Sequence, residues 1–391
     1  MRRIGREFGA GKPVDHYGYQ KTRDGCLPDS LIAVYPEDTM DRESHCLLER
    51  LLLAHGPGGQ EDEVRNLCQT QLARHCDEVT LDRAGNVIGL IRSAHPSHPD
   101  DGIRVMAHLD EIAMLVKRVA ANGTLEVVAL GGAQPISFGV CPVDILGDVE
   151  TLAGVLSYGS MHNSGCTAQG RDVLAGDVHW PDVHIVTRRS AQELAALGVR
   201  PGTRVVLSKH WRQPFHLPNA IAAHFLDDRA PLLATIKAAQ GVAKERHRLR
   251  QDVWFVCTTL EEESNAGAMY AASRLAGDTT IAVEVGPVLD EYGTTLSADP
   301  IINTGDEKGY YSRDVVDGLI DAGKRAGYMP QVALLVDFAS DASAVMSSGI
   351  CARAGCIAIP TENTHGFEII DEAGIDACAA TLIEFLLAER S

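Results

Sequence analysis

The chain has 391 residues, of which 45% are apolar and 23% charged, and its formal net charge at neutral pH is −18. This is the composition of a folded protein that is large enough for two domains. The strong negative charge argues against binding to nucleic acid or to anionic membranes, because both present phosphate groups that would be repelled. Aromatic residues make up only 5% of the chain, so the sequence shows no sign of a surface on which bases would stack.

The sequence also gives expectations about the compartment. It contains no run of about 18 apolar residues that would span a membrane. The first twenty residues, MRRIGREFGAGKPVDHYGYQ, lack the apolar core of a secretory signal. The ten cysteines are scattered without a CxxC pair, which is typical of reduced thiols and argues against a zinc–cysteine site. We therefore expect a cytoplasmic protein whose cysteines are reduced.

The first third of the chain predicts an extension followed by helices and short strands. Residues 1–40 are rich in glycine, proline and charge and show no sustained periodicity, so we expect an N-terminal extension. From Glu43 a helical pattern leads through the glycine-rich turn HGPGGQ into a second amphipathic helix. The segment EVTLDRAGNVIGLIR then alternates like a hairpin, and residues 103–108 form an apolar strand. Residues 41–118 are thus expected to open a larger α/β domain.

The pattern changes between residues 119 and 213, where glycines and short β-like stretches surround one helical piece, SAQELAALG. This pattern predicts a small β-rich module inserted into the larger domain. From residue 214 to residue 391, helices alternate with strands that we expect at 253–260, 279–286, 332–338 and 356–360. Such alternation is typical of an α/β fold with a mostly parallel sheet that helices sandwich on both faces.

Histidine and carboxylate side chains follow several of these strands. They are His108, Asp110, Asp227, Asp228, Glu261, Glu262, Glu284 and His365. Ligands bind outside the carboxyl ends of strands in α/β sheets, so we expect these side chains at one edge of the sheet. Two histidines with several carboxylates suit Zn²⁺, Co²⁺ or Mn²⁺, and one carboxylate could bridge two ions.

Each of these features has a simpler alternative. A single histidine after a strand is more often satisfied within the core or at the surface. Asp227 and Asp228 could cap the helix that follows them, and the three glutamates at 261–263 could form a solvated loop tip. Glu284 is harder to explain, because it falls inside the apolar segment IAVEVG, where an unpaired carboxylate is costly. A metal centre would account for all of these residues together.

The segments HLDE, LDDR, LEEE, VEVG and PTENTHG resemble the motifs of the M42 family of metallo-aminopeptidases, also called TET or glutamyl aminopeptidases. The resemblance runs from about Glu43 to the C-terminus, and the order and spacing of the motifs make it specific. It implies that residues 41–118 and 214–391 form a catalytic domain and that residues 119–213 form an oligomerisation domain.

The resemblance also implies a role for each candidate residue. Two divalent ions, zinc or else cobalt or manganese, would be held by His108, Asp227, Glu262, Glu284 and His365. Asp227 would bridge the ions, Asp110 would orient His108, and Glu261 would be the general base. Three positions depart from the family pattern, since Ala113 and Ser264 replace a usual glycine and Glu284 a usual aspartate. None of these departures removes a ligand.

The expected activity is removal of N-terminal residues from short peptides that have a free N-terminus, by a metal-activated water. A metal-dependent deacylase or carboxypeptidase of a related family is one alternative, and a non-catalytic metal-binding assembly protein is another. An endoglucanase would need paired carboxylates without metal, and the pair His108 and His365 argues against it. The resemblance further implies a homo-oligomer of between two and twelve subunits.

Overall fold

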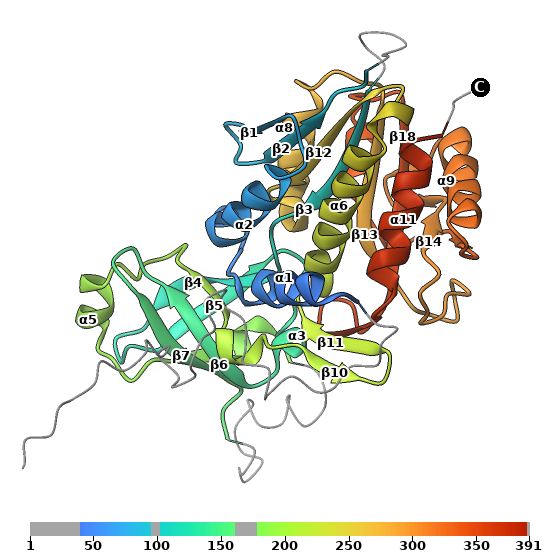
Figure 1. Ribbon diagram of the computed structural model, residues 1–391. Helices are drawn as coiled ribbons and strands as arrows, with labels where there is room; N and C mark the ends of the chain where they lie inside the picture. The colour runs from blue at the N-terminus through green and yellow to red at the C-terminus, as the bar shows by residue number, and fades with distance from the viewer. Residues whose placement is uncertain (1–39, 95–101, 161–177, 389–391) are drawn as a thin grey trace, which may run out of the picture.

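The computed structural model describes residues 40–94, 102–160 and 178–388. Within these ranges the chain forms a large α/β domain and a smaller β-barrel that lies beside it (Figure 1). No helix in these ranges is long and apolar enough to cross a membrane. The N-terminal extension expected at residues 1–40 falls almost entirely outside the described residues, so it stays a prediction.

The large domain is built on a mixed sheet with the strand order β1-β2-β12-β3-β13-β18-β19-β11-β10. In that order the strands are Glu78–Leu81, Val87–Ile91, Asp252–Thr258, Gly102–His108, Thr279–Pro287, Arg353–Glu362, Phe367–Asp371, Ala220–His224 and Phe215–Leu217. The four strands β12, β3, β13 and β18 are parallel, and the flanking strands are antiparallel. The expected α/β fold is confirmed, and along this order the sheet is parallel only at its centre. Short turns join β1 to β2, β18 to β19 and β10 to β11 as antiparallel hairpins.

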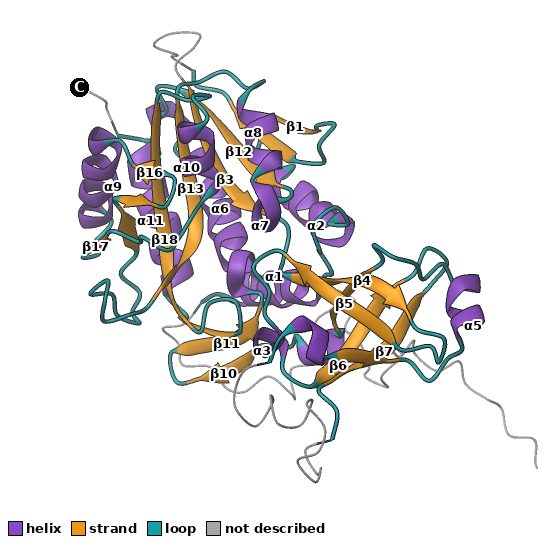
Figure 2. Cartoon of the chain, turned by 180° about the vertical axis from the view of Figure 1, so that it is seen from behind, coloured by secondary structure: helices purple, strands orange, loops and turns teal. Residues whose placement is uncertain are grey.

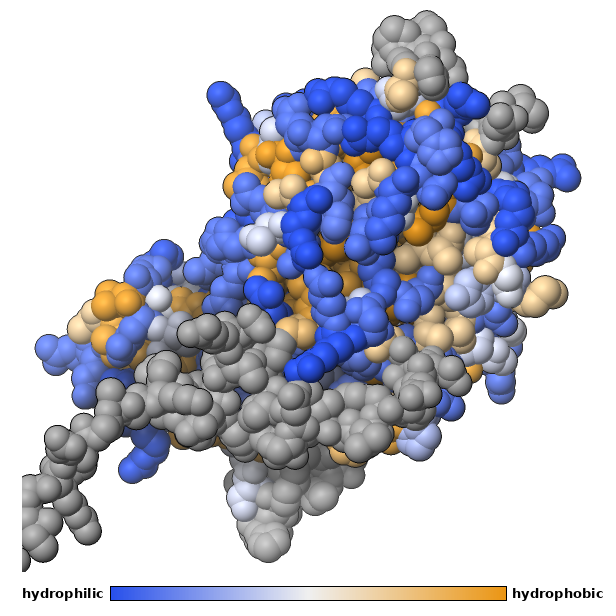
Figure 3. All heavy atoms as spheres, viewed as in Figure 1, coloured by the Kyte–Doolittle hydropathy of each residue, from blue (hydrophilic) through white to orange (hydrophobic). Residues whose placement is uncertain are grey.

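Helices cover both faces of this sheet. One face carries α1 (Arg42–Leu53), α2 (Asp62–Leu72), α6 (Leu226–Lys244), α9 (Arg313–Arg325) and α11 (Gly374–Leu386), as Figure 1 shows. The other face carries α7 (Glu261–Ser264), α8 (Ala266–Ala272) and α10 (Asp341–Ser347), as the reverse view in Figure 2 shows. The outer surface of the first face is mainly hydrophilic (Figure 3), in keeping with the charge of the chain.

The smaller domain is a closed barrel with the strand order β4-β5-β8-β7-β6-β9 and its own apolar core. Its strands are, in chain order, Ala113–Val119, Leu125–Leu130, Cys141–Leu146, Thr151–Ser157, His184–Val186 and Arg204–Leu207, and its helices are α3 (Pro135–Phe138) and α5 (Ala191–Ala196). The barrel begins at Ala113, earlier than residue 119, where we expected the β-rich module to start. The apolar run MAHLDEIAMLV crosses the boundary without a break, so composition gave no signal there.

The strand expected at 332–338 is wrong over most of its length. Only Gln331–Ala333 forms a strand, β17, which pairs with β14 (Ile301–Asn303). Because β14 is three residues long, the ladder ends with it, and the Asn303 side chain accepts a hydrogen bond from the Leu335 N–H. Two further short strands, β15 (Gly305–Asp306) and β16 (Gly309–Tyr310), form a separate hairpin.

One cysteine differs from the expectation of reduced thiols. Cys46, in α1, is disulfide-bonded, whereas the other cysteines within the described ranges are free. The expectation is therefore wrong for Cys46, since scattered spacing along the sequence does not exclude close approach in the fold. A cytoplasmic location stays a prediction.

Candidate metal centre

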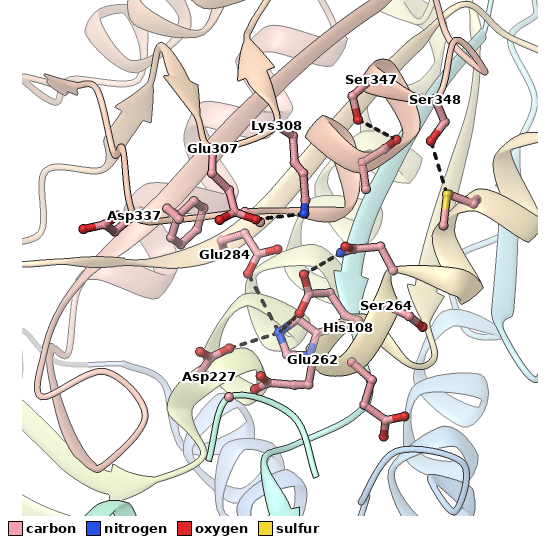
Figure 4. A pocket seen from close by; sticks show the side chains of 18 of the residues that line it. His108, Asp227, Glu262, Ser264, Glu284, Glu307, Lys308, Asp337, Ser347 and Ser348 are labelled. Atoms are coloured by element: carbon pink, nitrogen blue, oxygen red, sulfur yellow. Dashed lines mark hydrogen bonds and ion pairs between the residues drawn. The ribbon is translucent and has the colours of Figure 1, made fainter. Parts of the chain in front are cut away.

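Six of the eight side chains that sequence analysis singled out converge on one cavity at the carboxyl edge of the parallel strands (Figure 4). His108 ends β3, Glu284 lies in β13, and Asp227 stands at the start of α6. Glu261 and Glu262 open α7, directly after β12, and His365 lies in the turn between β18 and β19. The cavity has a volume of about 690 Å³, and these six residues line it.

Two sets of side chains in this cavity could each hold a metal ion. The first set is His108, Asp227, Asp228 and Glu284, and the second is Asp227, Glu262 and His365. Within each set the ligand atoms lie within 4.8 Å of one another. Asp227 belongs to both sets, because its Oδ1 lies 3.0 Å from His108 Nε2 and its Oδ2 lies 3.6 Å from His365 Nε2. One carboxylate is thus shared between two ligand sets.

The remaining distances complete the two sets. Oε2 of Glu284 lies 3.8 Å from Nε2 of His108, so the side chain reaches the first set although aspartate is usual at this position. Oε2 of Glu262 lies 3.5 Å from Nε2 of His365. Asp228, a candidate residue to which the family resemblance gave no ligand role, belongs to the first set, and its Oδ2 accepts a hydrogen bond of 2.7 Å from the His108 backbone N–H.

The electrostatics of the cavity fit bound cations. Burial raises the pKa of Glu262 and of Glu284 well above the usual range, and the charges of Asp227 and Asp228 respectively add to the shift. Burial favours the neutral ring of His108, but Asp228 and the other carboxylates raise its pKa well above the usual value. Oδ1 of Asp228 is buried and has no hydrogen-bond partner among the described residues. A buried cluster of carboxylates with an unpaired oxygen is the donor set that divalent ions complete.

Asp110 supports both the first ligand and the glutamate pair. Its Oδ1 accepts a hydrogen bond of 3.0 Å from the Glu261 N–H, and its Oδ2 accepts one of 3.1 Å from the Glu262 N–H. Its backbone carbonyl lies 3.1 Å from Nδ1 of His108, closer than its carboxylate, at 3.6 Å. Asp110 therefore fixes the first turn of α7, and its main chain rather than its side chain makes the closer contact to His108.

Glu368, in β19, contacts both ends of the second ligand set, and sequence analysis missed it. Its side chain is only 1% exposed, and its oxygens accept hydrogen bonds of 2.9 Å from the Asp227 N–H and 3.0 Å from the His365 N–H. It thus holds two residues of the second set by their main chains. The segment FEIID offered one signal, because Glu368 stands two residues before Ile370 and therefore falls on the same face of a short strand as that apolar residue.

A buried ion-pair cluster lies beneath the first ligand set. The carboxylate of Glu111, which is 1% exposed, pairs with the guanidinium groups of Arg212 and Arg229. Arg229 also donates to the Leu109 carbonyl, and Arg212 donates to the Ala54 carbonyl over 2.9 Å. Burial opposes ionisation of Glu111, but the two arginines outweigh it and lower its pKa. Two arginines therefore anchor the segment HLDE through Glu111. Arg229 belongs to α6 of the α/β domain, and Arg212 lies in the stretch that follows the barrel.

The barrel also reaches the cavity, through the loop after β5. A Cβ atom on Gly132 would lie 2.7 Å from Cε1 of His365, and one on Gly131 would lie 2.9 Å from Cβ of Glu262. Gly131 has a φ of +75°, which also favours glycine. The absence of side chains at these two positions lets the barrel loop pack directly on the second ligand set.

The sequence of the chain is similar to those of known aminopeptidases. Residues 85–381 match the family described as M42 glutamyl aminopeptidase. The lysyl aminopeptidase of Pyrococcus furiosus is 26% identical over 241 residues, which is 61% of this chain and 65% of that protein.

Two solved structures share the fold. A TET aminopeptidase from a marine-sediment thaumarchaeon has a TM-score of 0.79 at 21% identity and covers 88% of this chain and 96% of its own. The TET1 peptidase of Pyrococcus horikoshii, which can assemble into a tetrahedron or a large octahedral shell, has a TM-score of 0.75 at 21% identity, covering 87% of this chain and 98% of its own.

Proposed function

The chain belongs to the M42 glutamyl aminopeptidase family and is thus a peptide-bond hydrolase, and on this premise we propose that it uses two divalent metal ions to remove N-terminal residues from short peptides. The observation that carries the proposal is the placement of Asp227, whose two carboxylate oxygens face two histidines of different ligand sets. A shared carboxylate between two such sets is the arrangement of two-metal hydrolytic sites.

Each ion would have its own ligands besides Asp227. His108, Asp228 and Glu284 would hold the first ion, and Glu262 and His365 would hold the second. When bound, the ions would supply Lewis acidity, which lowers the pKa of a water and polarises a carbonyl group. The ligand types suit Zn²⁺, Co²⁺ and Mn²⁺ alike.

Glu261 is the residue that we assign to proton transfer. It lines the cavity but belongs to neither ligand set, and its Oε2 lies 3.9 Å from Nε2 of His108. Burial raises its pKa well above the usual range, and the charges of Asp341 and Glu262 act in the same direction. A carboxylate of raised pKa is a stronger base, so Glu261 would take the proton of the attacking water and deliver it to the leaving amine.

The free N-terminus is the feature of the substrate that the cavity would recognise. Beyond the ligands, the lining includes Glu263, Glu307 and Asp337, so carboxylates outnumber cationic side chains in it. A protonated or metal-binding α-amine is attracted to such a lining, whereas an acetylated one carries no charge. We extend to this chain the expectation of a homo-oligomer, which the assembly of the Pyrococcus horikoshii TET1 peptidase supports.

The test is hydrolysis of matched short peptides with free or acetylated N-termini, by chelated protein reloaded with Zn²⁺, Co²⁺ or Mn²⁺. We expect metal-dependent release of the first residue from the free peptides alone. Equal cleavage of the acetylated peptides would move the assignment to a deacylase or endopeptidase. Full metal occupancy without turnover on any peptide would overturn the proposal in favour of a metal-binding protein.

A further inference from the structure

Asn265 lies at the junction of α7 and α8, beside the cavity, and sequence analysis gave it no role. It is 7% exposed and has a left-handed backbone conformation, with a φ of 53°. Its side-chain Nδ2 donates a hydrogen bond of 2.6 Å to Oε1 of Glu261 and another of 3.2 Å to Oδ1 of Asp341. One amide group thus connects Glu261 to a second buried carboxylate.

The partners of this amide fix its orientation. Both contacts are carboxylate oxygens, which accept hydrogen bonds, so the NH₂ group rather than the amide oxygen must face them. Asp341 is itself held, because it is 1% exposed, opens α10, and its Oδ2 accepts a hydrogen bond of 2.5 Å from the Thr258 hydroxyl. The series Thr258–Asp341–Asn265–Glu261 therefore runs from the end of β12 to the cavity through buried groups.

This arrangement leaves the two oxygens of Glu261 in different situations. Oε1 is occupied by the amide of Asn265, whereas Oε2 faces His108 of the first ligand set. A long glutamate side chain that is free to rotate would visit several rotamers, and the hydrogen bond selects one of them. The oxygen that points to the ligand set is then the one available to accept a proton.

We propose that Asn265 is a positioning residue for the proton-transfer step: anchored by Asp341, it holds Oε1 of Glu261 so that Oε2 is presented to the attacking water. This inference rests on the peptidase function proposed above, and it adds a residue of the cavity lining that acts through Glu261. Outer partners of this kind typically contribute 10- to 100-fold to activity.

The choice of variants follows from the backbone at this position. Glycine and aspartate both tolerate a left-handed conformation, so neither Asn265→Gly nor Asn265→Asp is penalised by the turn. Asn265→Gly deletes the donor. Asn265→Asp keeps the shape but places a third carboxylate between two others. We expect kcat to fall about 10- to 100-fold in both, with at least as large a loss for aspartate, at unchanged metal content per chain.

The decisive comparison is a double-mutant cycle with Glu261→Gln. If Asn265 acts through Glu261, Asn265→Gly lowers kcat strongly in the natural background and by less than about twofold in the Glu261→Gln background. An equal fractional loss in both backgrounds, or no loss in the natural one, overturns the proposal. Asn303→Ala is the matched control and should keep the natural kcat. It also removes a buried amide, but one that accepts a hydrogen bond from the Leu335 N–H in another part of the fold.

A crystal structure of Asn265→Gly gives a readout that does not depend on turnover. We expect the Glu261 side chain to leave its position while His108 and Asp227 stay in theirs. An unmoved Glu261 contradicts the inference, even if the protein proves inactive on every peptide. Failure of the aminopeptidase function would instead appear in the unsubstituted protein, so the two failures are distinguishable.

Discussion

Asp227 lies with its Oδ1 3.0 Å from Nε2 of His108, and this contact leaves its Oδ2 facing the other ligand set. The side chain can take this position because its own main chain is held: the Asp227 N–H donates to Glu368. The bridging geometry therefore depends on residues from the start of α6, the end of β3 and the strand β19 together.

Removal of the shared ligand should affect both ions, whereas removal of a ligand from one set should affect one. We expect Asp227→Asn to lower the affinity for both ions and His365→Ala to lower the affinity for one ion only. The check is metal content per chain after dialysis against a series of free-metal concentrations. Loss of a single ion from Asp227→Asn would contradict the shared role.

Glu368→Gln should weaken the second ligand set without direct contact to an ion. The amide NH₂ group of glutamine would face one of the two backbone N–H groups that the carboxylate now accepts from, so that group loses its acceptor. We expect an about 10- to 100-fold loss of affinity for the ion of the second set, which loses support at both Asp227 and His365, and a smaller loss for the ion of the first set, which shares only Asp227. Isothermal titration with metal measures both affinities.

The matched control for this prediction is Glu362→Gln, an exposed glutamate at the end of β18, for which we expect natural affinities. A similar loss of metal affinity in both variants would indicate a general effect of altered charge on the hairpin. It would contradict a specific role of Glu368.

The pH dependence of stability follows from the raised pKa of Glu284. Burial and the charge of Asp228 raise the pKa of the folded carboxyl well above the ordinary pKa of a glutamate, which the unfolded chain retains. Between these two pKa values the folded state holds a proton that the unfolded state has lost, so stability falls as pH rises. In chelated protein, Glu284→Gln should therefore gain melting temperature relative to the natural chain between pH 5 and pH 8 by a margin that grows with pH.

The measurement is differential scanning calorimetry of both chelated proteins at pH 5 and pH 8. A constant difference in melting temperature at the two pH values would mean that Glu284 ionises with its ordinary pKa. After reloading with metal, the natural chain should instead have the higher melting temperature of the two, because the charged carboxylate of Glu284 then has a cation as partner.

Gly132→Ala should disturb the second ligand set from the side of the barrel. The added Cβ would lie 2.7 Å from the ring of His365, which is closer than side chains pack, so the ring or the loop must move. We expect weaker binding of one ion with little change in melting temperature. Gly202→Ala controls for altered loop backbone, because nothing lies within 4 Å of the added atom although the φ of +89° favours glycine, and we expect it to keep the natural metal affinity. Equal metal affinity of the two variants would contradict the prediction.

Much of the fold and of the site was accessible from the sequence because the relevant patterns are local. Runs of apolar residues followed by His108, Glu261 or Asp227 mark the ends of β-strands and the start of a helix, and the topology of α/β sheets brings such ends together. The antiparallel edges of the sheet and the early start of the barrel were not accessible, since neither changes the local composition.

The supporting residues were missed for a different physical reason. Glu368 and Asn265 make hydrogen bonds to groups that are distant in sequence or ordinary in type, and the pattern that places Glu368 on a buried face does not say which groups it contacts. Asp228 was visible beside Asp227, but only the fold shows that its free oxygen is buried against His108 and Glu284.

We propose above that two ions share the carboxylate of Asp227. Anomalous diffraction at the zinc edge, from crystals of the zinc-loaded protein, locates each bound ion. We expect two peaks, one beside each oxygen of Asp227, with His108 next to one and His365 next to the other. A single peak, or peaks away from Asp227, would contradict it.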